Sequence, residues 1–278
     1  MRRPSPSSTD SLTLAAVCAR LAAHPAVDGL LTLGSTATEA LEPTSDYDLV
    51  VVLNAAPVPL RVALTTIEQR LTDVIFLPTA ELPSAEMATP PHPIWEPAQV
   101  QRWLREGRII FDRTGQIARA TAGAQAIPEV TADEAQRYAA RFSINYNLQQ
   151  SRRMRLANDQ HYQTAVDLRL LFSLHDLWRY YFVMRQLPVY GEKAQSRYLA
   201  EHDPEYLAAF RACLHATDRD DKFHRYEGLA ERTLAPGGPL WVEGVTAVLP
   251  VRAEAWTADS PEVALAYWQQ LISEEAGS

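Results

Sequence analysis

The sequence is poor in the residues that build disulfide frameworks and basic surfaces. Its two cysteines, Cys18 and Cys213, lie far apart, and neither belongs to a Cys-x-x-Cys or a Cys/His cluster. Isolated thiols in amphipathic stretches are typical of free, buried cysteines in a reducing compartment, so we expect a cytoplasmic protein. Lysine is also rare, since Lys193 and Lys222 are the only two in the chain.

Neither a basic charge balance nor a long apolar run is present. The chain carries 34 acidic residues against 26 lysines and arginines, a formal net charge of -8. Gripping a long nucleic-acid backbone requires a basic surface, so we expect a small or phosphate-bearing substrate instead. No apolar run approaches the roughly 20 residues of a membrane span, and the basic start Met1–Ser8 continues into polar residues like a tail, not a secretion signal.

Residues 34–48 combine a glycine-serine turn with a pair of aspartates. An apolar run leads into Gly34-Ser35, and after a polar turn a second apolar run begins at Asp46. Both runs are typical of β-strands. Because side chains alternate along a strand, Asp46 and Asp48 share one face and lie roughly 6.6 Å apart. That separation suits two carboxylates that hold divalent cations, since paired catalytic metals sit about 3.5–4 Å apart.

Helix and strand signals alternate over residues 1–127, which predicts a mixed sheet with flanking helices. The expected helices span about 10–24, 60–71 and 99–106, and the expected strands about 27–33, 46–53, 71–77 and 108–112. Asp10 or Ser11 can cap the first helix. The third strand carries a single acidic residue, Asp73, and a proline-rich loop at about 78–97 follows it.

The hydrophobic period changes to 3.6 residues after Pro128, where we place a domain boundary. Residues 128–278 are expected to form a helical bundle, so the fold class is α+β. Thr131–Glu134 has the pattern of a capping box that opens a helix to about residue 158. A helix near 160–186 is apolar nearly all round, which predicts the buried centre of the bundle. Shorter helices are expected at 193–201, 204–216 and 260–272, with no firm prediction for 217–259.

A set of residues in the first part of the chain resembles the polymerase-β-like nucleotidyltransferase superfamily. The set is Gly34-Ser35, then after ten residues Asp46-Tyr47-Asp48-Leu49, and Asp73 in a later apolar strand. More narrowly, the chain is similar to the small-molecule branch that includes kanamycin and lincosamide nucleotidyltransferases. That branch also carries a helical domain after the sheet, so the resemblance implies that residues 128–278 close on the substrate or the nucleotide.

The resemblance implies an enzyme that transfers a nucleoside monophosphate, in our prediction AMP from ATP, to a hydroxyl of a small acceptor with release of pyrophosphate. Two Mg2+ ions held by Asp46, Asp48 and Asp73 would neutralise the phosphate charges. Gly34 lets the backbone approach the phosphates, and Ser35 offers a hydroxyl and N–H groups to them. An aminoglycoside-like antibiotic is the leading acceptor, since the acidic chain attracts cations. A homodimer and no membrane partner are also expected.

The sequence departs from the family after the Gly-Ser pair, where many members have an arginine and then a glycine. Thr36–Glu39 keeps only the alanine of that pattern. Related enzymes place a lysine of the helical domain on the triphosphate, and we assign this role to Lys193. Their general base is a glutamate beyond the third strand. Glu86 and Glu96, in the proline-rich loop, are the candidates here, and Asp73 can itself serve.

Other functions fit parts of the sequence. Arg169 and His175 loosely resemble the Arg/His pair of HEPN ribonucleases, although six residues on one helix place two side chains about 120° apart. A nucleotide-binding regulator without catalysis and a protein-adenylylating enzyme of the toxin–antitoxin type are two further alternatives. Without any of these functions, the same residues would be ordinary turn, edge-strand and surface residues.

Overall fold

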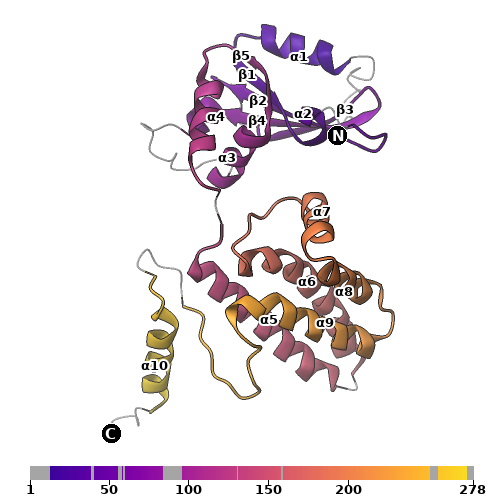
Figure 1. Cartoon of the computed structure of the whole chain (residues 1–278), viewed down its shortest axis with the longest axis vertical. Coiled ribbons are helices and arrows are strands. Elements are labelled where there is room, and N and C mark those ends of the chain that lie inside the picture. The colour runs from indigo at the N-terminus through magenta and orange to yellow at the C-terminus, as the bar shows by residue number, and fades with distance from the viewer. Residues whose placement is uncertain are drawn as a thin grey trace. The chain divides into compact units, whose positions relative to one another are not determined.

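The computed structural model describes residues 13–38, 41–55, 58, 60–83, 96–129, 131–157, 159–250 and 256–273. The chain divides into two compact units, Met1–Glu129 and Val130–Ser278, which we call the first and the second unit. Figure 1 shows a sheet with helices in the first unit and a group of helices in the second. The tail interpretation of Met1–Ser8 falls outside the described residues.

The first unit is built on a five-stranded mixed sheet with the strand order β3-β4-β2-β1-β5. Its strands are β1 (Val27–Thr32), β2 (Tyr47–Leu53), β3 (Val62–Ile67), β4 (Arg70–Pro78) and β5 (Arg108–Asp112). Its helices are α1 (Leu14–Ala23), α2 (Gly34–Thr38), α3 (Pro97–Glu106) and α4 (Gln116–Ala126), with a short 3-10 turn, η1 (Thr79–Glu81). Only the β2–β4 pair is parallel among these strands. The mixed sheet predicted from the sequence is confirmed.

The central strand β2 is buried on both faces. Val50 and Val52 pack in one core with side chains of α3 and α4, while Leu49 and Val51 pack in another with Cys18 of α1. This two-sided burial explains why β2 reads as a continuous apolar run after Asp48. The strand order therefore places the aspartate end of β2 in the middle of the sheet.

The helix predicted at residues 60–71 is wrong. Residues 62–67 form β3, which pairs antiparallel with β4, and Glu68 and Gln69 join the two strands with φ of 51° and 64°. Positive φ at both positions is the geometry of a tight two-residue hairpin, usually signalled by Asn-Gly or Asp-Gly. The Glu-Gln pair lacks that signal, so the spacing of Leu64 and Leu71 suggested a helix instead.

Two predicted caps are shifted and one helix was missed. The N-cap of α1 is Thr13, whose Oγ1 accepts from the N–H of Ala16, and the predicted caps Asp10 and Ser11 precede the described residues. The capping box before the long helix is formed by Asp133 and Gln136, two residues later than predicted. Helix α4 had no counterpart in the prediction, because its alanine-rich sequence has weak amphipathic contrast.

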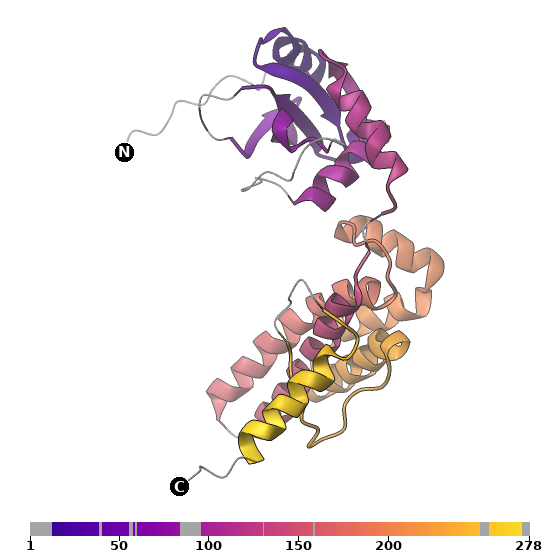
Figure 2. The same ribbon diagram turned by 90° about the vertical axis from the view of Figure 1, so that its left-hand side faces the viewer.

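The second unit is helical, as the sequence predicted. Its helices are α5 (Glu134–Arg155), α6 (Gln160–Met184), α7 (Glu192–His202), α8 (Pro204–His215), α9 (Arg219–Leu234) and α10 (Ser260–Ser273), with a 3-10 turn, η2 (Ala235–Gly237). Figure 2 shows α10 in yellow at the end of the chain. Helix α9 occupies part of the stretch without a firm prediction, and it contributes Phe223 and Tyr226 to the core. Across the residues described, no helix is both long and apolar enough to cross a membrane.

Helix α6 is buried on one side only. The prediction that it forms the buried centre of the bundle therefore holds for one side of the helix and is wrong for the other. Leu170 and Phe182 are buried in the core of the second unit. Leu168, Leu171 and Phe172 are instead 52%, 57% and 68% exposed. The apolar residues all round the helix hid this difference, because periodicity alone cannot tell which of several apolar faces is packed.

We expect a phenylalanine-to-alanine change on α6 to be costly on one side and harmless on the other. Phe182→Ala should lower the free energy of unfolding by about 3–5 kcal/mol, because it leaves a cavity. The matched control Phe172→Ala should change it by less than about 0.5 kcal/mol, since the ring is exposed. Urea denaturation followed by circular dichroism measures both, and similar losses for the two variants would contradict the one-sided packing.

Candidate functional site

The pairing of β2 with β4 brings two of the predicted site residues together. In this parallel pair Asp48 lies directly opposite Asp73. Neighbouring strands are about 4.7–4.9 Å apart, and paired residues point to the same face of the sheet. Both aspartates are half-buried. The strand that carries Asp73 thus lies beside the one that continues from Asp46, the arrangement that a shared role of these carboxylates requires.

Asp46 is exposed and lies one residue before the start of β2. A turn precedes it, in which the N–H of Ser45 donates to the carbonyl of Glu42 (3.0 Å) and the N–H of Glu42 donates to Oγ of Ser45 (2.9 Å). Ser45 is therefore a turn residue. Thr36 of α2 contacts the backbone on both sides of Tyr47. Its Oγ1 lies 3.4 Å from the carbonyl oxygen of Asp46 and 3.4 Å from the N–H nitrogen of Asp48.

Gly34 begins the short helix α2 against the carboxylate of Asp48. Its φ is +54°, and a Cβ at this position would lie 3.3 Å from Oδ2 of Asp48. The N–H of Leu33 donates to the carbonyl of Asp48 (3.0 Å), which ties the turn to β2. Glycine is thus favoured by the backbone conformation, and a Cβ would make a tight contact with the carboxylate. As the first residues of a helix, Gly34 and Ser35 have N–H groups with no partner inside that helix.

The three aspartates place several negative charges close together. Burial, together with the negative charges of Asp46 and Asp73, raises the pKa of Asp48 to about 6. None of the ion pairs found within the described part of the chain involves any of these three aspartates. Three carboxylates that form no such ion pair favour a cation between them.

The donor set fits Mg2+ through its oxygen ligands. Mg2+ is usually held by one or two carboxylates together with water and substrate phosphates, not by an all-protein cage. Asp48 and Asp73 supply such a pair, with Asp46 nearby in sequence. Over the described ranges, no group of three or more His, Cys, Asp or Glu side chains forms a ready-made metal site. The three-aspartate metal set therefore stays a prediction.

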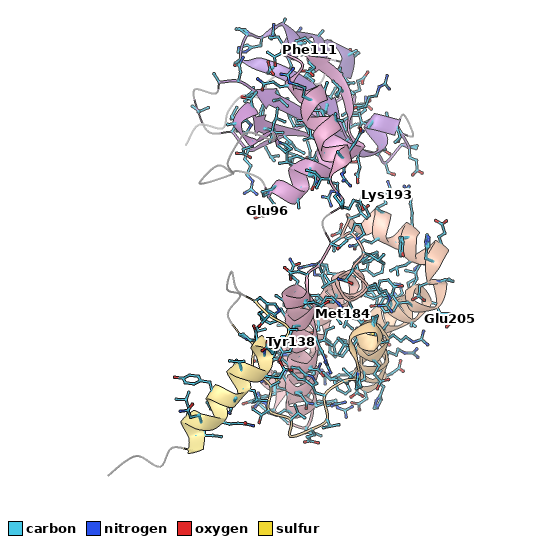
Figure 3. All side chains as sticks on the ribbon, turned by 60° about the vertical axis from the view of Figure 1, so that its left-hand side comes forward. Glu96, Phe111, Tyr138, Met184, Lys193 and Glu205 are labelled. Atoms are coloured by element: carbon cyan, nitrogen blue, oxygen red, sulfur yellow. The ribbon has the colours of Figure 1, made fainter. Side chains whose placement is uncertain are left out.

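The predicted general bases Glu86 and Glu96 stay predictions. Glu86 lies outside the described residues. Glu96 is the exposed N-cap of α3, and the hydrogen bonds found for it are those of its carbonyl, which accepts from the N–H groups of Gln99 (2.9 Å) and Val100 (3.1 Å). Figure 3 labels Glu96 at the start of α3. Asp73 is the one candidate base that the sheet register brings to Asp48.

The remaining candidate residues belong to the second unit. Lys193 is exposed in the first turn of α7, as labelled in Figure 3. On α6, Arg169 donates to Oδ1 of Asn147 (2.8 Å) and lies 5.9 Å from the centre of the Tyr146 ring. His175 on the same helix is exposed. Arg169 is thus engaged by α5, which weakens the case for a ribonuclease pair with His175.

Comparison with known proteins finds limited similarity. No protein-family model matches the chain. No curated protein matches it either. A solved nucleotidyltransferase-like protein from Exiguobacterium sibiricum 255-15 is similar at 16% identity, with 80% of this chain and 74% of that one covered and a TM-score of 0.40.

A second solved structure is a spectinomycin adenyltransferase from Enterococcus faecialis with ATP and spectinomycin. It is 15% identical, with 75% of this chain and 92% of that one covered and a TM-score of 0.33. At this level of similarity, the chain's own residues have to carry any assignment of function.

The raised pKa of Asp48 predicts how the metal-free protein responds to pH. The pKa rises from 3.8 to about 6 on folding, so the folded state holds this proton more tightly, and stability falls as pH rises through that window. Asp48→Asn should therefore stabilise the protein at about pH 7.5 in EDTA, by roughly 1 kcal/mol after allowance for solvent screening, and much less at about pH 4.

Urea denaturation at the two pH values measures this difference. Glu231→Gln, on the exposed surface of α9, is the matched control and should show no such pH dependence. Equal effects of Asp48→Asn at both pH values would contradict the electrostatic account.

Proposed function

We propose that the chain is a Mg2+-dependent nucleotidyltransferase that transfers a nucleoside monophosphate, AMP from ATP, to a hydroxyl of a small acceptor and releases pyrophosphate. The observation that carries this proposal is the β2–β4 register, which sets Asp48 opposite Asp73 beside the helix start at Gly34. Two carboxylates next to the first N–H groups of a helix can serve the cation and the phosphate of the same metal–nucleotide complex.

We assign the three carboxylates the role of cation ligands. Asp48 and Asp73 would hold them from adjacent strands, with Asp46 from the preceding turn. When bound, two Mg2+ ions supply charge neutralisation at the attacking and leaving oxygens of phosphoryl transfer. Burial, and after it repulsion from Asp46 and Asp73, raises the pKa of Asp48. A divalent cation at this place would relieve the repulsion, so cation binding and ionisation of Asp48 would favour each other.

We assign the binding of the phosphates to the start of α2 and to a lysine. Gly34 has no side chain to block the approach, and Ser35 adds a hydroxyl at the same turn. No arginine follows within α2. Lys193 is the proposed substitute, because it adds a positive charge to the first turn of α7, where the helix dipole already favours anions.

The acceptor is proposed to be a small molecule, with an aminoglycoside-like compound as the leading candidate. The net charge of -8 favours the approach of a cationic molecule. Residues 1–127 would form the nucleotidyltransferase domain, and residues 128–278 the domain that closes on the substrate or the nucleotide. Asp73 is the proposed base for the acceptor hydroxyl, since it is the candidate placed beside Asp48.

A screen of acceptors with α-labelled ATP and Mg2+ tests this proposal. We expect label transfer and pyrophosphate release with the wild type, and loss of at least about a thousandfold with Asp48→Ala, because the cations lose a ligand. Glu231→Ala should retain full transfer. Equal transfer by wild type and Asp48→Ala would contradict the mechanism. ATP binding without pyrophosphate release, across all acceptors, would favour a regulator instead.

The two lysines of the chain provide a matched pair of variants. Lys193→Ala should raise the KM for ATP by about tenfold, the loss expected for one charge-assisted hydrogen bond, with the fold retained. Lys222→Ala, on α9, should leave this KM unchanged. Steady-state kinetics at varied ATP measure both. An unchanged KM for Lys193→Ala would remove that residue from the proposed site.

A further inference from the structure

Asp46 differs from the other two carboxylates in how its backbone is fixed. Asp48 and Asp73 lie inside β2 and β4 and are held by the sheet ladder. Asp46 precedes β2, so no ladder bond of that strand fixes it. Its place therefore depends on the contacts of the turn at residues 42–45 and of its own peptide groups.

Arg70, the first residue of β4, fixes this turn. Its Nη1 donates to the carbonyl of Glu42 at 2.6 Å and to the carbonyl of Ser45 at 2.8 Å. The second carbonyl belongs to the planar peptide group that carries the N–H of Asp46, so its orientation sets the direction in which the chain enters Asp46. Hydrogen bonds from a charged donor are stronger than those between neutral groups.

The side chain of Arg70 is itself held in place. Its guanidinium carbon lies 5.7 Å from the centre of the Tyr47 ring. The hydroxyl of Tyr47 donates to Oε2 of Glu68 (3.0 Å), which also accepts from the N–H of Leu14 (3.2 Å). Arg70 is thus linked through Tyr47 and Glu68 to the β3–β4 turn and to the start of α1.

The peptide group on the other side of Asp46 is held by Thr36. Its Oγ1 donates to the carbonyl of Asp46 and accepts from the N–H of Asp48. These bonds are 3.4 Å long, whereas those of Arg70 are 2.6 Å and 2.8 Å. Arg70 therefore makes the stronger of the two contacts that flank Asp46.

We propose that Arg70 is a positioning residue, which sets the carboxylate of Asp46 relative to Asp48 and Asp73 and so determines the affinity of the site for divalent cations. This inference rests on the proposed function of the three aspartates. Residues that orient metal ligands typically change metal affinity by 10- to 100-fold when they are replaced. The exposed position of Asp46 leaves few other contacts to take over this role.

The direction in which an Arg70 variant changes cation affinity separates a positioning role from an effect of charge alone. Arg70 is positive and donates to the carbonyl that precedes Asp46, so removal of its charge alone would not weaken the binding of a cation. Removal of a positioning contact would weaken it. Arg70→Met keeps an unbranched chain against Tyr47 but has no donor, whereas Arg70→Lys keeps a donor that can reach a carbonyl. The two variants therefore test the hydrogen bonds and not the packing.

Mn2+ binding to the full chain, measured by water-proton relaxation, is the direct test. We expect Arg70→Met to weaken Mn2+ binding at least about tenfold and Arg70→Lys to stay within about threefold of the wild type. Arg20→Met, on α1, is the charge control and should not weaken binding. Hydrogen exchange at residues 42–48 should speed up in Arg70→Met while circular dichroism stays unchanged.

Unchanged or tighter Mn2+ binding by Arg70→Met would overturn the inference, as would a wild type that binds no Mn2+. These outcomes remain separate from the proposed function, which is judged by label transfer. If the wild type transfers label and Arg70→Met binds Mn2+ normally, the inference fails alone. If the wild type binds Mn2+ through Asp48 but transfers no label to any acceptor, the proposed function fails and the role of Arg70 stands.

Discussion

The parallel pairing of β2 with β4 is the constraint on which the rest of the site depends. It sets Asp48 opposite Asp73, although 25 residues separate them in the sequence. A one-residue slip of either strand would turn one carboxylate to the other face, where Leu49 and Val74 pack in the core with α1. The apolar residues that follow the aspartates therefore lock the register, and fold stability and site geometry have the same origin.

Around this register, the site combines negative charge with close backbone approach. Burial and the neighbouring charges of Asp46 and Asp73 raise the pKa of Asp48, and a Cβ at Gly34 would lie 3.3 Å from Oδ2 of that carboxylate. The raised pKa means that ionisation of Asp48 lowers the stability of the metal-free protein. A carboxyl group with a raised pKa, held by a well-packed sheet, is typical of binding and catalytic sites. Arg70 adds hydrogen bonds to the turn before Asp46, and in our proposal these bonds set the position of the Asp46 carboxylate.

The sequence was informative where one pattern dominated. The apolar runs at β1, β2 and β4 predicted strands, and the structure confirms them. The β3–β4 hairpin was missed because its turn residues, Glu68 and Gln69, adopt positive φ without a glycine or asparagine. No local pattern shows that Asp73 pairs with Asp48 or that Arg70 reaches the turn before Asp46, because register and side-chain reach are set by tertiary contacts. For the same reason, the exposed side of α6 could not be told from its packed side.

The most direct test of the account is a double-mutant cycle on Mn2+ affinity with Asp48→Ala, Asp73→Ala and the combined variant. If the register makes the two carboxylates one site, either single change should remove nearly all of the binding energy that the double change removes, which is strong non-additivity. Water-proton relaxation with a non-hydrolysable ATP analogue gives the affinities. Additive losses, or Mn2+ binding that neither change affects, would show that the paired aspartates do not form a shared cation site.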